Sequence, residues 1–134
     1  MPILKWNETE FIEYLETLPI VEEDEVSHCF EVSKDDLLLQ LTIWQYESIM
    51  KFAIFQDGIE NAAIAMTLIV RDKARYVKEK KLEFLEFCQC IPAPSHFSYL
   101  DFKEDPFALK KYPYSLNMRL FVKPQIEIQF VPNV

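Results

Sequence analysis

The chain contains a single glycine, Gly58, among 134 residues. Average usage would place roughly nine glycines in a chain of this length. Glycine lets the backbone adopt positive φ angles and approach a phosphate closely. The glycine-rich nucleotide-binding loops and the GxSxG nucleophile turn are therefore absent from the sequence. These classes of nucleotide-binding protein and hydrolase are excluded.

The length of the chain predicts one domain that spans residues 1–134. Half of the residues are apolar and 14% are aromatic. A chain of this size buries about two-thirds of its unfolded surface when it folds. The hydrophobic core alone therefore suffices for folding, and we expect no disulfide, metal or other cofactor.

The cysteines and the apolar segments indicate a cellular compartment. The sequence has three cysteines, Cys29, Cys88 and Cys90. An odd number of cysteines, two of which lie only two residues apart, does not fit a disulfide framework. Residues 1–8 have neither a basic leader nor an apolar segment. The longest apolar stretch, Ala62–Val70, is too short to cross a bilayer as a helix. We expect a cytoplasmic protein that does not contact membranes.

The net charge of −8 is distributed unevenly along the chain. Residues 1–67 carry 14 acidic and 3 basic side chains, a balance of −11, whereas residues 68–134 carry 8 and 11, a balance of +3. Acidic residues cluster at Glu22–Glu25, and basic residues cluster in segment 71–81. Solvated loops explain such runs, but a bipolar surface also fits a basic partner at one end, or a second copy placed head to tail.

The N-terminal segment carries clear helix signals. Asn7 is a preferred N-cap residue, and Glu10 follows three positions later, as in a capping box. Trp6 precedes the cap and Phe11 is the fourth helical residue, which suits a hydrophobic staple. Apolar residues then recur at helical spacing. The pattern predicts an amphipathic helix over Glu8–Leu18.

Most of the remaining chain alternates apolar and polar residues with a period of two, which predicts β-strands. Short turns separate the first strands, at Ser33–Asp36, Glu47–Ser48 and Gln56–Gly58. Such turns join antiparallel neighbours and leave no room for crossover helices. The predicted strands are Val26–Val32, Leu37–Tyr46, Met50–Phe55, Ala62–Val70, Leu116–Val122 and Ile126–Phe130; Ala62–Val70 is apolar on both faces, which predicts a central strand. Pro124 and Pro132 bracket the last of these strands, which suits a sheet edge.

Three segments fit more than one structure. Asp72–Lys81 is either an extended hairpin tip or a short helix. Leu82–Ile91 fits neither period cleanly, and the prolines that follow it favour a strand over a helix. Ile91–Lys111 is a connector rich in proline and aromatic residues, with a short helix possible at Pro106–Lys110.

These elements predict an α+β fold, in which one N-terminal amphipathic helix packs on a mainly antiparallel meander sheet of five to seven strands. The alternative is a mostly-β sandwich or half-barrel with the helix as a lid.

No group of residues forms a strong catalytic or metal-binding motif. Cys88 and Cys90 with His28 and His96 are a poor zinc set, because structural sites use CxxC spacing rather than CxC. His28 and Cys29 are neighbours on a strand and point to opposite faces, so they cannot form a catalytic pair. His28 fits a core histidine with one satisfied nitrogen. Carboxylate pairs lie in predicted turns, where water keeps their pKa values ordinary. An enzyme is therefore less favoured than a binding protein.

Our leading interpretation is a non-catalytic protein-interaction module, such as an adaptor, an inhibitor or an immunity-type factor. Its partner would be another protein or a second copy in a homodimer. Acidic small proteins can occlude basic sites on enzymes. Exposed aromatic residues on the second face of the sheet would add to the interface, unless a second sheet layer covers them. The candidate partner-binding residues are Glu22, Glu23, Asp24, Glu25, Trp44, Tyr46 and Phe55.

Two other functions remain open. A small-ligand pocket or an enzyme site between helix and sheet would be lined by Trp44, Tyr46, His28 and Arg119. Alternatively, the basic segment 71–81 would contact phosphate or nucleic acid. In an extended chain its candidate phosphate-binding residues share one face, although acidic neighbours and the net charge oppose nucleic-acid binding. These residues are Arg71, Lys73 and Arg75.

Overall fold

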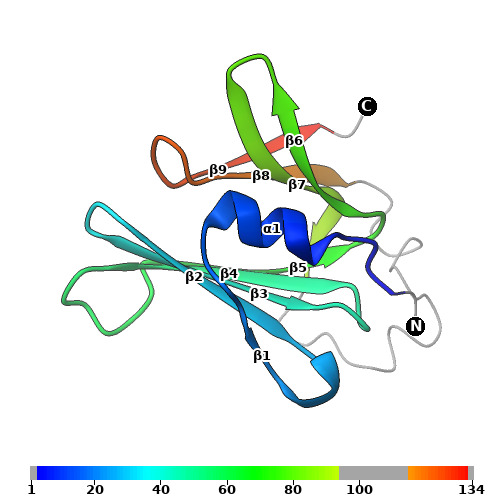
Figure 1. Cartoon of the computed structure of the whole chain (residues 1–134), viewed down its shortest axis with the longest axis horizontal. Coiled ribbons are helices and arrows are strands. Elements are labelled where there is room, and N and C mark those ends of the chain that lie inside the picture. The colour runs from blue at the N-terminus through cyan, green and yellow to red at the C-terminus, as the bar shows by residue number, and fades with distance from the viewer. Residues whose placement is uncertain (1–2, 94–114, 133–134) are drawn as a thin grey trace.

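The computed structural model describes residues 3–93 and 115–132 (Figure 1). Within this part, the chain forms one antiparallel sheet of nine strands with one short α-helix, so the protein is mostly β. The elements are α1 (Glu8–Leu15), β1 (Ile20–Val21), the 3-10 turn η1 (Glu23–Glu25), β2 (His28–Lys34), β3 (Leu37–Trp44), β4 (Ile49–Gln56), β5 (Ile64–Val70), β6 (Ala74–Glu79), β7 (Leu82–Pro92), β8 (Leu116–Phe121) and β9 (Glu127–Pro132).

The strands β1 to β5 form the predicted meander, in which each strand pairs with the next along the chain. The turns at Asp35 and at Glu47–Ser48 fall where the sequence places them, since Lys34 pairs with Leu37 and Trp44 with Ile49. Leu39, Leu41 and Ile43 of β3 point into the core, as their alternation predicts. The antiparallel part of the fold prediction is therefore confirmed.

The predicted number of five to seven strands was too low. The sheet order is β1-β2-β3-β4-β5-β7-β8-β9, with β6 paired to β7 beside this path. The two-residue strand β1 is too short to show any periodicity, so the sequence gives no sign of it. Segment 72–81 forms β6 and a tight turn, which makes it the hairpin rather than the helix of the two alternatives. The strand preferred for Leu82–Ile91 is confirmed as β7.

The strand β7 joins two parts of the sheet that lie on either side of α1 (Figure 1). One edge of β7 pairs with β8, and the other edge pairs first with β6 and then, at Cys90–Pro92, with β5. A bulge at Gln89 lies between these two pairings. The Gln89 N–H donates to Asn117 Oδ1 at 3.0 Å, and its carbonyl accepts from the Arg71 N–H at 3.0 Å. The bulge thus redirects the strand without leaving this peptide unpaired.

The helix α1 begins as predicted. Asn7 Oδ1 accepts a hydrogen bond from the Glu10 N–H at 3.2 Å, and the rings of Trp6 and Phe11 meet edge to face at 5.1 Å. Phe11 contacts Phe30 of β2 and Phe87 of β7, so the helix packs between both parts of the sheet. The predicted end at Leu18 was wrong. Glu16 adopts a left-handed conformation with φ 56°, and α1 therefore ends at Leu15.

Seven residues other than glycine adopt positive φ in the described part of the chain: Glu16, Asp24, Glu25, Asp35, Ser48, Lys80 and Gln89. Gly58 also has positive φ, and nothing lies within 4 Å of the position a Cβ would take there. Left-handed conformations cost side-chain-bearing residues about 1–2 kcal/mol each. The chain therefore builds its turns largely without the residue best suited to them.

The predicted helix at Pro106–Lys110 and most of the connector lie outside the described residues. No helix within residues 3–93 and 115–132 is long and apolar enough to span a membrane.

Candidate functional site

A groove lies on the outer face of the sheet, opposite the core, and spans β2 to β5 beside β1. Its volume is about 570 Å³. Strand register sets its floor, where Gln40 of β3 faces Ala53 of β4, and Ala53 faces Ala65 of β5. The groove is lined by Ile20, Glu22, Ser27, Cys29, Gln40, Thr42, Trp44, Lys51, Ala53, Phe55, Glu60, Asn61, Ala62 and Ala65.

Aromatic side chains mark the two ends of the groove. Phe55 pairs across the strands with Leu38, and Trp44 lies six residues further along β3. At about 3.4 Å per residue, these two ends are roughly 20 Å apart. Between them the floor consists of small or polar side chains. The groove is therefore long and shallow, with its axis along the strands.

The rims of the groove are exposed and acidic. Ile20 and Glu22 of the β1 segment form one side, and the loop residue Glu60 belongs to the other. Lys51 is the single cation among the described residues that line the groove. The rim that carries Glu22 continues into the acidic turn Glu23–Glu25.

The floor of this face differs from an ordinary solvated sheet face. An antiparallel sheet exposed to water on one side normally carries polar and charged residues there. Here Ala53 is only 6% exposed, and Cys29, Ala62 and Ala65 add further small, weakly polar surface. The small side chains leave room for another molecule to approach this part of the sheet.

The segment 18–26 beside the groove adds apolar surface to the acidic turn. Exposed large hydrophobic residues in it are Leu18, Ile20, Val21 and Val26. Its conformation is held by hydrogen bonds, because Ser27 Oγ donates to Glu22 Oε1 at 2.7 Å and Gln45 Nε2 donates to the Glu25 carbonyl at 3.1 Å. The acidic turn is thus a fixed structural feature next to the groove.

The structure brings together three of the seven predicted partner-binding residues. Glu22, Trp44 and Phe55 line the same groove. Glu23, Asp24 and Glu25 form η1 next to it and are exposed. Tyr46 lies in the β3–β4 turn and is also exposed, but it does not line the groove. Their role in binding a partner stays a prediction.

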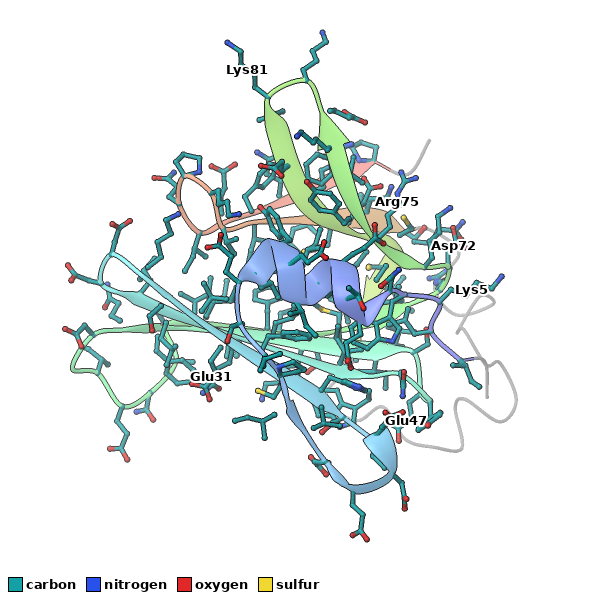
Figure 2. All side chains as sticks on the ribbon, in the orientation of Figure 1. Lys5, Glu31, Glu47, Asp72, Arg75 and Lys81 are labelled. Atoms are coloured by element: carbon teal, nitrogen blue, oxygen red, sulfur yellow. The ribbon has the colours of Figure 1, made fainter. Side chains whose placement is uncertain are left out.

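The three predicted phosphate-binding residues occupy unlike environments. Arg71 is only 7% exposed, whereas Lys73 is exposed. Arg75 directs its Nε and Nη2 atoms to Glu86 Oε1, at 3.1 and 2.7 Å. The other exposed lysines of this segment, Lys78, Lys80 and Lys81, lie near the β6–β7 turn, where Lys81 projects away from the body of the protein (Figure 2). Phosphate binding by these residues stays a prediction.

Sequence reasoning missed an ion-pair network around a buried carboxylate on β7. The Glu86 side chain is 3% exposed and bonds Arg75 through Oε1 and Arg119 Nε through Oε2, the latter at 3.1 Å. Burial by itself raises the pKa of Glu86. The hydrogen bonds from the two guanidinium groups have the larger combined effect, so the pKa of Glu86 lies below its ordinary value. The arginines come from β6 and β8, 11 and 33 residues away, so only the pairing of strands reveals the network.

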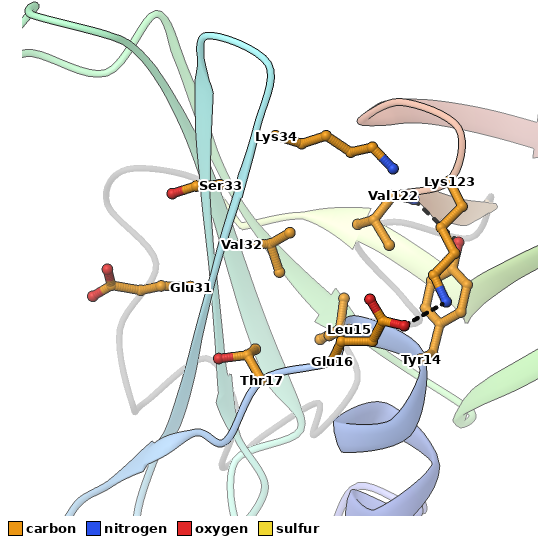
Figure 3. A pocket seen from close by; sticks show the side chains of 10 residues that line it. All are labelled: Tyr14, Leu15, Glu16, Thr17, Glu31, Val32, Ser33, Lys34, Val122 and Lys123. Atoms are coloured by element: carbon orange, nitrogen blue, oxygen red, sulfur yellow. Dashed lines mark hydrogen bonds and ion pairs between the residues drawn. The ribbon is translucent and has the colours of Figure 1, made fainter.

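A second cavity, of about 350 Å³, lies between the end of α1, β2 and the segment after β8 (Figure 3). Lys34 extends across it toward Val122, and Lys123 Nζ lies 3.5 Å from Glu16 Oε1. A pocket between helix and sheet is therefore present. Trp44, Tyr46, His28 and Arg119, which the sequence suggested as its lining, lie elsewhere.

His28 has the environment predicted for a core histidine. It is 2% exposed, its Nε2 lies 2.7 Å from Glu8 Oε2, and no partner is found for Nδ1 among the described residues. Burial raises the pKa of Cys88 to about 11 and that of Cys90 to about 12. No group of three or more potential metal ligands occurs in the described residues, and His96 lies outside them.

Comparisons with known proteins give a likeness in fold. No protein-family model and no curated protein sequence matches the chain. Among solved structures, the chain is similar to a chain of the "Contact-dependent growth inhibition toxin - immunity protein complex from Klebsiella pneumoniae 342". The TM-score is 0.70 and the identity 13%, over 97% of both chains. The likeness thus covers almost the whole fold.

Proposed function

We propose that this protein is an immunity-type protein, which binds a second protein and holds it inactive without catalysing a reaction itself. The observation that carries the proposal is the groove on the outer sheet face, with its weakly polar floor and acidic rims. The similarity in fold to a chain of a toxin–immunity complex supports the same class.

The charge of the groove surroundings indicates the nature of the partner. Glu22 and Glu60 line the rims, and η1 adds three further acidic residues beside one of them. Complementary charge steers a partner to such a surface and selects among competitors. The partner is therefore a protein with a basic binding surface, and its association with this chain weakens as salt rises.

The buried ionisable groups of the described residues support binding rather than catalysis. Glu86 is held by two arginines and His28 by Glu8. Cys88 and Cys90 have raised pKa values, which keep them in the unreactive thiol form at neutral pH. The carboxylate and the imidazole are thus engaged in contacts within the fold.

The proposal is tested by capturing the partner at the groove and measuring its neutralisation. A photoreactive phenylalanine analogue replaces Phe55 in cells of the source organism, and the matched control carries it at Leu82, on the far hairpin. A protein that cross-links only from position 55 is then expressed alone and together with this chain. We expect its expression alone to arrest growth, and co-expression to restore growth.

Charge variants sharpen the same test. Glu22→Lys combined with Glu60→Lys should weaken the rescue of growth, whereas Lys78→Glu combined with Lys81→Glu should leave it intact. The proposal is wrong if no protein cross-links at position 55, or if the captured protein is harmless or equally toxic with and without this chain.

The cavity at the end of α1 supports a second candidate function, the binding of a small ligand. Lys34, Lys123 and Glu16 place charges of both signs at its walls. Trp6 packs against Phe11 of the same helix, so a ligand that shifts α1 would change tryptophan fluorescence. A flat fluorescence response across a panel of metabolites would exclude this candidate.

A further inference from the structure

We infer that the groove receives an α-helix of the partner protein, lying along β3 and β4, with small or apolar residues on its buried face and basic residues along both flanks. This inference rests on the proposed function and specifies how its binding surface is used.

The dimensions of the groove fit one helix. The distance of roughly 20 Å between Trp44 and Phe55 equals the length of about 13 helical residues. The floor strands β2 to β5 are spaced about 4.8 Å apart, so the outermost two lie about 14 Å from each other. A helix with its side chains is about 10–12 Å wide. The groove therefore accommodates a single helix of three to four turns.

The backbone of the floor favours a helix over an added strand. The strands β3 and β4 pair with neighbours on both edges along the groove, and β2 pairs with β1 at His28 and Cys29, so the main-chain groups beneath the helix are already used. Contact across this face is thus made through side chains. Small floor residues such as Ala53, Ala65 and Thr42 let a helix approach the sheet closely. Helix on sheet is also one of the few stable ways to cover an open sheet face.

The charges across the groove set a pattern for the helix. Glu22 lies at one rim and Glu60 at the other, and Lys51 lies on β4 between them. A complementary helix carries Lys or Arg on each flank, and one carboxylate or amide oxygen opposite Lys51 within its otherwise small or apolar buried face. A helix with the reverse arrangement would place like charges against both rims. The groove therefore selects its partner by charge order as well as by shape.

The test uses the partner protein whose toxicity this chain neutralises. Calorimetry measures the affinity between the two proteins. Ala53→Arg fills the floor, and the matched control Leu82→Arg adds the same side chain to the exposed hairpin turn. We expect Ala53→Arg to weaken binding at least 100-fold and Leu82→Arg to change it less than 3-fold. Thr42→Arg, at a partly exposed floor position, is the second variant in case Ala53→Arg does not fold.

Cross-linking then reports the shape of the bound segment. A benzophenone maleimide is attached at Cys29, and separately at a cysteine introduced by Thr42→Cys or Ala65→Cys in a Cys29→Ser background. The helix predicts partner attachment sites that are three, four or seven residues apart, with basic residues on both sides of them.

The outcomes separate the two proposals. If Ala53→Arg and Thr42→Arg change neither the growth rescue nor the affinity, the partner does not bind through a helix in the groove. The immunity-type function is then still supported. Attachment sites two residues apart along an extended segment, or attachment to a second copy of this chain, also overturn the inference. If no protein is neutralised, both proposals fail.

Discussion

The hydroxyl of Tyr14, in the N-terminal helix, accepts a hydrogen bond at 3.1 Å from the backbone N–H of Val122, the residue that follows β8. The same hydroxyl donates to the Glu83 carbonyl at 2.8 Å. One side chain therefore fastens α1 to β7 and to the segment after β8. The contact joins residues that are 108 positions apart in the sequence, and it holds α1 against the sheet.

Replacing Tyr14 by Phe should destabilise the protein. The ring still fills its site, but the buried Val122 N–H loses its partner, at a cost of about 1–3 kcal/mol. Urea denaturation at pH 7 measures the change. Tyr46→Phe is the control, because Tyr46 lies exposed in a turn, and its effect should stay within about 0.5 kcal/mol. Equal stability of the two variants would show that the hydrogen bond to Val122 contributes nothing.

Glu86→Gln should destabilise the sheet in a pH-dependent manner. Removing the carboxylate charge leaves two guanidinium groups without their counter-ion, and because both are partly exposed to water we expect a loss of about 1–2 kcal/mol at pH 7. The folded pKa of Glu86 is lowered, so its ion pairs stabilise the protein fully above the ordinary glutamate pKa. This stabilisation is lost as the pH falls through the folded pKa.

The corresponding measurement is the free energy of unfolding from pH 7 to pH 3. The difference between wild type and Glu86→Gln should shrink as the pH falls. Glu60→Gln, at an exposed rim position, should run parallel to the wild type. A difference that stays constant over this range would contradict the assigned ion pairs.

One thiol per folded chain should react with a maleimide at neutral pH, and three should react after denaturation. Cys29 is partly exposed in the groove, whereas Cys88 and Cys90 are buried with raised pKa values. Mass spectrometry counts the labels. Cys29→Ser should abolish labelling of the folded chain, and persistent labelling of that variant would place Cys88 or Cys90 at the surface.

Lys80→Gly should stabilise the protein by about 0.5–1 kcal/mol, because Lys80 adopts φ 55° at the first position of the β6–β7 turn. Lys81→Gly is the control, since Lys81 does not have positive φ and gains nothing from glycine. Thermal denaturation of both variants gives the comparison. Stabilisation by Lys81→Gly instead would mean that the turn has a different conformation.

Local patterns predicted the parts of the fold that depend on neighbouring residues. Alternation identified β3 and β4, and the Asn7 cap identified the start of α1. The end of α1 was misplaced, because Glu16 adopts a left-handed conformation and ends the helix at Leu15, which leaves Leu18 outside the helix and exposed. Propensity alone does not reveal that the tertiary structure needs only two helical turns.

Features built from distant segments could not be predicted in the same way. The Arg75–Glu86–Arg119 network needs the register of three strands, which no local pattern encodes. The groove was anticipated only as scattered residues. Glu22, Trp44 and Phe55 were each identified by chemistry, but their placement around one floor follows from the pairing of β2 to β5. Lys51 and Glu60 gave no sequence signal that set them apart from other charged residues.

The pairing of β5 with the end of β7 also affects the chain while it is being synthesised. The meander through Val70 can assemble on the ribosome hairpin by hairpin, but the edge at Leu68–Val70 waits for Cys90–Pro92 to emerge. During that interval an apolar strand edge is open to neighbouring nascent chains. A product that stops before residue 90 keeps that edge permanently, so prematurely terminated chains would be substrates for chaperones and proteases.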